Sequence, residues 1–151
     1  MWNCENVKPR NLIMHILIIN GPNMNLLGKR EPHLYGDRPF ESYLQELRST
    51  YADTEIEYRQ SNHEGDLIDW LQEADGKADG IILNAAAYTH TSIAIRDAVA
   101  AISTPVIEVH LTDISQREKF RQISLLHDVC KASVMGKGLQ GYQEAIEILK
   151  G

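Results

Sequence analysis

The chain has 151 residues, 43% of them hydrophobic and 24% charged, with a formal net charge of -6 at pH 7. This is the composition of an ordinary globular protein with one core, because domains commonly run to about 100–150 residues. The 15 lysines and arginines are scattered, which argues against nucleic-acid binding, and no apolar run approaches the roughly 18 residues of a membrane span.

The N-terminal segment differs from the rest of the chain. Residues 1–13 lack the apolar stretch and the cleavage site of a secretory signal peptide, and we expect them to form a loose N-terminal extension. We expect residues 14–151 to form a single domain. The chain has two cysteines, Cys4 and Cys130, and no CxxC pair, which favours a reducing compartment and predicts a cytoplasmic protein.

The first predicted strand, His15–Ile19, is a continuous apolar run, as expected for a strand that is buried on both faces. A connector with repeated glycine and proline breaks, Asn20–Pro39, follows it. Compact domains mostly join a strand to its helix in about 2–6 residues, and much longer connectors are often lids or binding loops. Because this connector also carries Asn23, Arg30 and Tyr35, we expect it to act as a closing lid over a functional site.

The rest of the chain alternates between two patterns. Apolar residues at helical spacing predict helices, and short apolar or alternating runs predict strands. In chain order, the predicted elements are a helix at 40–51, a strand at 54–60, a helix at 66–74, a strand at 79–84, a helix at 91–102, a strand at 105–110, a helix at 115–126, a strand at 131–135 and a helix at 139–150.

This alternation predicts right-handed crossovers and a parallel sheet with helices on both faces. The predicted fold class is therefore α/β, a flavodoxin-like three-layer fold with a five-stranded parallel sheet. In such sheets a ligand binds beyond the carboxyl ends of the strands, near the topological switch point. The polar residues expected around that crevice are Asn23, Arg30, Tyr35, Asn84, His90, Thr91, Glu108, His110, Thr112 and Arg121.

These residues favour proton transfer over other chemistry. No serine stands beside a histidine in a strained elbow and no cysteine lies in these loops, which argues against covalent catalysis. A metal site made of His90, Glu108 and His110 lacks the spacing of a zinc motif, so we expect no metal. No phosphate-binding GxxxxGK[ST] run follows the first strand, and a receiver domain would need an aspartate in place of Asn84.

Seven short motifs are distributed over nearly all of the chain after the extension. They are NGPNMNLLG at 20–28, REPxxYG at 30–36, QSNHEG at 60–65, YTHTS at 88–92, RDA at 96–98, EVHL at 108–111 and QGY at 140–142. Their order and spacing resemble those of the type II 3-dehydroquinate dehydratase family, which has a flavodoxin-like fold. The resemblance implies a hydro-lyase of the shikimate pathway, and of aromatic amino acid biosynthesis, with residues 14–151 as its catalytic domain.

The resemblance also implies the reaction. Water leaves 3-dehydroquinate by anti elimination through an enolate to give 3-dehydroshikimate, without a metal, a cofactor or a lysine imine. Tyr35 resembles the general base of the family, and Arg30 resembles the cation that stabilises its phenolate. A guanidinium at about 4 Å supplies about 4 kcal/mol in an effective dielectric near 20, so one arginine suffices. A non-catalytic flavodoxin-like binding module for small molecules remains the alternative.

Further roles follow from the same resemblance. His110 resembles the general acid that protonates the departing hydroxyl, and imidazole suits this task near neutral pH. Glu108 is expected to orient His110. Asn23 resembles the residue that holds a water against the enolate oxygen, where negative charge develops.

The substrate-binding residues implied by the resemblance surround these groups. Asn84, His90 and Arg121 are expected to hold the ring hydroxyls, and Leu111 and Thr112 the carboxylate. The family's counterpart of Asp97 reaches a neighbouring active site, so the resemblance implies a homo-oligomer, typically a dodecamer of trimers.

The sequence departs from the family pattern at several positions. Asn-Pro-Gly is common where this chain has Asn84-Ala85-Ala86, and a His-Ala-Arg-Glu segment is common where it has Ser115-Gln116-Arg117-Glu118. Thr112 and Asp113 stand in place of Ser-Asn. Thr112 keeps the hydroxyl, so we expect carboxylate binding to survive. Asp113 adds negative charge near an anionic substrate, and we expect it to weaken binding or to alter its pH dependence.

Overall fold

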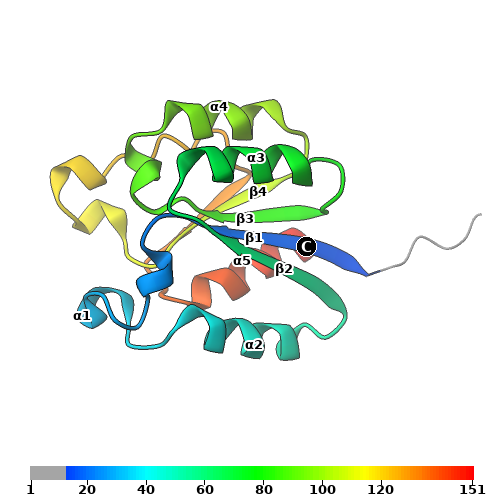
Figure 1. Ribbon diagram of the computed structural model, residues 1–151, viewed down its shortest axis with the longest axis horizontal. Coiled ribbons are helices and arrows are strands. Elements are labelled where there is room, and N and C mark those ends of the chain that lie inside the picture. The colour runs from blue at the N-terminus through cyan, green and yellow to red at the C-terminus, as the bar shows by residue number, and fades with distance from the viewer. Residues whose placement is uncertain (1–12) are drawn as a thin grey trace, which may run out of the picture.

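The computed structural model describes residues 13–151 (Figure 1). The predicted extension, residues 1–13, lies outside the described residues except for Ile13. In chain order, the strands and helices are β1 (Met14–Asn20), α1 (Pro32–Tyr35), α2 (Phe40–Thr50), β2 (Thr54–Gln60), α3 (Glu64–Ala74), β3 (Gly80–Asn84), α4 (Ile93–Ala101), β4 (Val106–His110), β5 (Ala132–Met135) and α5 (Gln140–Lys150). Short 3-10 helices occupy Met24–Leu26, Ala86–His90, Ile114–Gln116 and Lys119–Arg121.

The strands form a five-stranded parallel sheet in the order β2-β1-β3-β4-β5. Helices α3 and α4 cover one face of this sheet, and α2 and α5 cover the other (Figure 1). Neighbouring residues of β1 therefore enter different cores, because Ile18 packs on the side of α2 and α5 and Ile19 on the side of α3 and α4. The predicted flavodoxin-like three-layer fold is confirmed.

The strand order creates a switch point between β1 and β3. From β1 the chain crosses to β2 on one side, and from β3 it continues to β4 on the other. The connectors after β1 and β3 meet at this point, where the Gly21 N–H donates to the Asn84 carbonyl at 2.8 Å. A Cβ atom on Gly21 would lie only 2.6 Å from the Ala85 carbonyl oxygen, so the close approach requires glycine.

The predicted helix at 115–126 is wrong. This segment contains two separate 3-10 turns, and its backbone groups bind partners elsewhere in the fold. The Leu125 N–H donates to the Thr89 carbonyl at 2.9 Å, and the Leu125 carbonyl accepts from Arg96 at 2.7 Å. The Asp113 carboxylate caps the first of these turns by accepting from the Ser115 N–H at 3.0 Å.

The other predicted elements are confirmed, with shifted ends for two helices. Helix α3 begins at Glu64 rather than at residue 66. Helix α4 begins at Ile93, because the Ser92 hydroxyl caps it by accepting from the Ile95 N–H at 2.9 Å. Within residues 13–151, none of the helices has both the length and the apolar character needed to cross a bilayer.

Candidate active site

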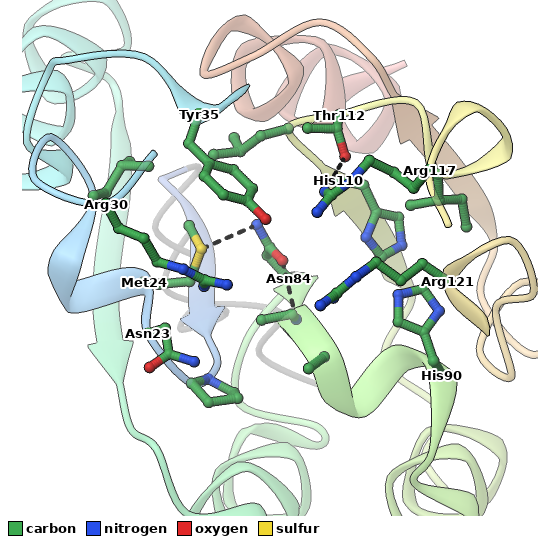
Figure 2. Close-up of a pocket in the computed structure, with 16 residues that line it drawn as sticks. Asn23, Met24, Arg30, Tyr35, Asn84, His90, His110, Thr112, Arg117 and Arg121 are labelled. Carbon is green, nitrogen blue, oxygen red and sulfur yellow. Dashed lines mark hydrogen bonds between the residues drawn. The ribbon is translucent and has the colours of Figure 1, made fainter. Parts of the chain in front are cut away.

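A cavity of about 190 Å³ lies at the switch point, beyond the carboxyl ends of β1, β3 and β4 (Figure 2). The connectors after these strands form its walls. The cavity is lined by Pro22, Asn23, Met24, Leu27, Arg30, Tyr35, Asn84, Ala86, Ala87, His90, His110, Leu111, Thr112, Ile114, Arg117 and Arg121.

Tyr35 enters the cavity from the connector after β1. It ends the short helix α1, which begins with Pro32 and is followed by Gly36. Its ring lies between two guanidinium groups, with the Cζ atom of Arg30 at 5.4 Å from the ring centroid and that of Arg117 at 5.6 Å (Figure 2). Two cations therefore contact the ring of this tyrosine.

Arg117 was not among the residues that the sequence pointed to. It lies in the segment that was predicted to be a helix. The sequence did contain a sign of its importance, because the Arg-Glu pair of the His-Ala-Arg-Glu segment is kept here as Arg117-Glu118. The Arg117 side chain is only 13% exposed and donates to the Thr112 hydroxyl at 3.2 Å. It thereby joins the phenol to the expected carboxylate site.

His110 and Glu108 form a buried pair at the end of β4. They are two residues apart and face the same side of the strand, with His110 Nε2 at 3.0 Å from Glu108 Oε2. This contact is bent rather than aligned as a straight hydrogen bond. His110 lines the cavity, whereas Glu108 is fully buried behind it. The second ring nitrogen of His110 is thus the one that can serve a ligand.

Two serines complete the surroundings of Glu108. Ser124 donates to one carboxylate oxygen, and Ser133 donates to the other at 2.8 Å. Burial raises the pKa of Glu108, but the contacts with His110, Ser124 and Ser133 outweigh it and hold that pKa below its ordinary value. Glu108 therefore stays ionised.

His90 has a defined tautomer. Its Nδ1 lies 2.8 Å from the Ile123 carbonyl oxygen, which only accepts, so Nδ1 carries the proton. Burial, together with the nearby positive charge of His110 and Arg121, lowers the pKa of His90 although the Ile123 bond opposes this. A neutral ring leaves Nε2 free to accept a hydrogen bond from a ligand hydroxyl.

Asn23 has an unusual backbone conformation. Its φ is 67°, in the left-handed region that asparagine tolerates better than most residues. The Asn62 side-chain oxygen accepts from the Asn23 N–H at 3.0 Å, and Gln60 donates to the same oxygen at 3.2 Å. The QSN part of the motif at 60–65 thus braces the turn that carries Asn23.

The remaining predicted site residues are divided between the cavity and other regions. Asn84, His90, Leu111, Thr112 and Arg121 line the cavity. Asp97 does not, because it is exposed on α4.

Asp113 lies outside the cavity lining. Its carboxylate accepts from the N–H of Ser115 and, at 2.6 Å, from the Ser115 hydroxyl. The Asp113 carboxylate, which was expected to repel an anionic substrate, is thus bound to Ser115 and does not face the cavity.

The charge of the cavity is positive. Arg30, Arg117 and Arg121 line it, and none of the described lining residues is acidic. Within residues 13–151, no group of three or more His, Cys, Asp or Glu side chains converges closely enough to hold a metal ion. The walls therefore suit an anionic ligand with several hydroxyl groups.

Ala86, which stands where glycine is common in the family pattern, has a strained backbone. Its φ is 52°, which costs a residue with a Cβ about 1–2 kcal/mol. We expect Ala86→Gly to raise the free energy of unfolding by about 1 kcal/mol, measured by urea denaturation. The matched control is Ala87→Gly, one residue on, where φ is not positive and glycine should lower stability. If both variants lowered the free energy of unfolding equally, the backbone at Ala86 would not be strained.

Comparison with known proteins gives consistent matches. The family model described as Dehydroquinase class II matches residues 14–150. A 3-dehydroquinate dehydratase of Campylobacter lari is 50% identical over 135 residues, which cover 88% of this chain and 84% of that protein. Another, of Halalkalibacterium halodurans, is 51% identical over 140 residues, covering 90% and 96%. The crystal structure of a type II dehydroquinase from Butyrivibrio crossotus has a TM-score of 0.87 and 46% identity, covering 92% of this chain and 99% of that one.

Proposed function

The chain belongs to the class II dehydroquinase family, its reaction is the removal of water from 3-dehydroquinate, and we propose that the cavity at the β1–β3 switch point performs this reaction. The protein is accordingly a hydro-lyase of the shikimate pathway. One observation carries the assignment of the site: a tyrosine between two guanidiniums shares one cavity with a buried histidine–glutamate pair.

The first half of the proposed reaction is proton abstraction. The Tyr35 phenolate takes a proton from the carbon next to the ketone, and the electron pair of that C–H bond forms an enolate. Arg30 and Arg117 stabilise the phenolate before the transfer. Asn23, at the opening turn of the long connector, holds a water that donates to the enolate oxygen.

The second half is loss of the hydroxyl group. The enolate collapses, the C–O bond breaks, and the His110 imidazolium gives its proton to the leaving oxygen, which departs as water. Glu108, in contact with His110 Nε2, holds the ring in one orientation. Base and acid act on opposite faces of the ring, as an anti elimination requires.

Substrate binding uses the rest of the lining. The neutral His90 ring accepts from one ring hydroxyl, and Asn84 and Arg121 hold the others. The Leu111 and Thr112 backbone, with the Thr112 hydroxyl, binds the carboxylate. The excess of guanidinium groups over carboxylates in the lining supports an anionic substrate.

A direct assay tests this assignment. Purified protein is mixed with 3-dehydroquinate, and the conjugated product is followed by its ultraviolet absorbance. We expect turnover that survives both chelators and borohydride. No turnover by folded, assembled protein would leave only the binding-module alternative, and inactivation by borohydride with substrate present would indicate an imine route.

We also propose that the protein is a homo-oligomer, a dodecamer of trimers, in which Asp97 reaches a neighbouring cavity. An exposed apolar group beside the cavity supports this, because Ile93 is 64% exposed and Phe120 and Ile123 are each 70% exposed. His90 binds the Ile123 carbonyl and lies three residues before the start of α4. The apolar group is therefore next to this helix, which carries Asp97. We also propose a cytoplasmic location, because the sequence has only two cysteines and no CxxC pair.

Charges placed in this apolar group should break the assembly. We expect the double variant Phe120→Glu/Ile123→Glu to sediment as smaller species in analytical ultracentrifugation. We also expect it to lose activity, because dissociation removes the Asp97 of the neighbouring subunit from the cavity. The control is Lys77→Glu, which makes the same change of net charge at an exposed residue between α3 and β3. An unchanged sedimentation coefficient in the double variant would contradict the proposed interface.

A further inference from the structure

The QGY motif ends at Tyr142, which has no part in the reaction described above. Tyr142 lies in the first turn of α5 and is fully buried, with its ring edge-on to Phe40 at a centroid distance of 5.0 Å. A Cβ atom on Gly141 would lie 3.3 Å from Val109 Cγ1, so glycine lets this turn lie close against the sheet. The motif therefore carries a phenol hydroxyl to the ends of the central strands.

This hydroxyl joins two buried amides. It donates to Asn20 Oδ1 at 2.7 Å and accepts from Asn84 Nδ2 at 3.1 Å. Asn20 ends β1 and Asn84 ends β3, and the two are opposite each other in the parallel register. A single oxygen atom from α5 thus ties together the two strand ends that flank the switch point.

The contacts of Asn84 determine how its amide is turned. The Ala86 N–H can only donate, so Asn84 Oδ1 accepts from it at 3.1 Å. The Tyr142 hydroxyl has given its proton to Asn20, so its oxygen accepts from Asn84 Nδ2. Both contacts select the same one of the two amide orientations.

One N–H of Asn84 remains available after these bonds. Its only other contact at Nδ2 among the described residues is the Met24 sulfur at 3.7 Å, which is a weak acceptor. Asn84 lines the cavity, where Figure 2 shows its side chain between Met24 and the ring of Tyr35. The spare N–H is therefore presented to a ligand.

We propose that Tyr142 is a positioning residue that holds Asn84 so that this N–H donates to a ring hydroxyl of the substrate. The inference rests on the proposed function, because it needs Asn84 to bind substrate in the same cavity. Without the Tyr142 hydroxyl, the amide torsion becomes free to rotate, since such terminal torsions have broad minima. The buried Nδ2 also loses the one good acceptor that it has within residues 13–151.

Steady-state kinetics of Tyr142→Phe test this role. We expect KM for 3-dehydroquinate to rise about tenfold, the effect of leaving one buried donor unpaired, with kcat changed by less than about threefold. The contact is present in ground state and transition state alike, so its loss weakens binding rather than chemistry. The matched control is Tyr43→Phe, which lies in the same aromatic cluster but whose buried hydroxyl has no partner among the described residues.

A double-mutant cycle separates positioning from general stability. If Tyr142 acts through Asn84, its effect on KM vanishes in an Asn84→Ala background. A KM effect that persists there, or a Tyr142→Phe variant with wild-type KM, would overturn the inference. If Tyr142→Phe does not fold, Asn20→Leu decides in its place, because it removes the acceptor that orients the Tyr142 hydroxyl. An inactive wild-type protein would instead refute the proposed function itself.

Discussion

Tyr35→Phe should lower kcat by about 10³-fold, because it removes the one oxygen that accepts the substrate proton. The ring, and with it the packing between Arg30 and Arg117, is retained in this variant. Binding of 3-dehydroquinate should therefore persist. Turnover is measured by the absorbance of the conjugated product, and binding by calorimetry on the same preparation.

The control for this change is Tyr51→Phe. This variant also loses a hydrogen-bonded hydroxyl, because the Tyr51 hydroxyl donates to Glu147 at 2.5 Å. Tyr51, however, lies outside the cavity lining. It should keep wild-type kcat. Near-wild-type turnover in Tyr35→Phe would show that another group removes the proton, and a loss of binding in this variant would show that the phenol holds the substrate rather than reacting with it.

The paired arginines give the second large effect. The guanidinium Cζ atoms of Arg30 and Arg117 lie 5.4 and 5.6 Å from the centroid of the Tyr35 ring, so both cations lie beside the proposed base. Arg30→Met and Arg117→Met should therefore each lower kcat about 100-fold at neutral pH.

Arg38→Met is the matched control for both arginines. Its guanidinium Cζ lies 5.6 Å from the ring centroid of Tyr43, so the same type of contact is broken outside the cavity. If Arg117→Met turned over at the wild-type rate, the single-arginine hypothesis drawn from the sequence would be sufficient. If it lost binding alone, Arg117 would serve the carboxylate through Thr112 rather than the base.

The sheet was predictable because its strands carry a local signal. Runs such as Gly80–Asn84 are apolar throughout and bounded by turn residues, and parallel strands buried on both faces need no more than that. The helix predicted at 115–126 failed for a long-range reason. Its backbone bonds go to Thr89 and Arg96, and sequence periodicity contains no information about such partners.

The site was predictable to a similar extent. Residues at strand ends, such as Asn84 and His110, follow from the rule for parallel sheets. Arg117 does not, because its approach to Tyr35 depends on the irregular path of the segment after β4. The role proposed for Asp97 needs a second copy of the chain, because this residue is exposed on α4 and does not line the cavity of its own chain.

Helix α1 is only four residues long, too short to persist in water on its own. Its position depends on the contacts of Tyr35 with Arg30 and Arg117, which come from connectors on opposite sides of the cavity. If the connector after β1 swings open, Tyr35 and Arg30 move together and separate from Arg117. The open protein then has the base without its second cation, so the enolate forms mainly in the closed protein, where bulk solvent cannot protonate it.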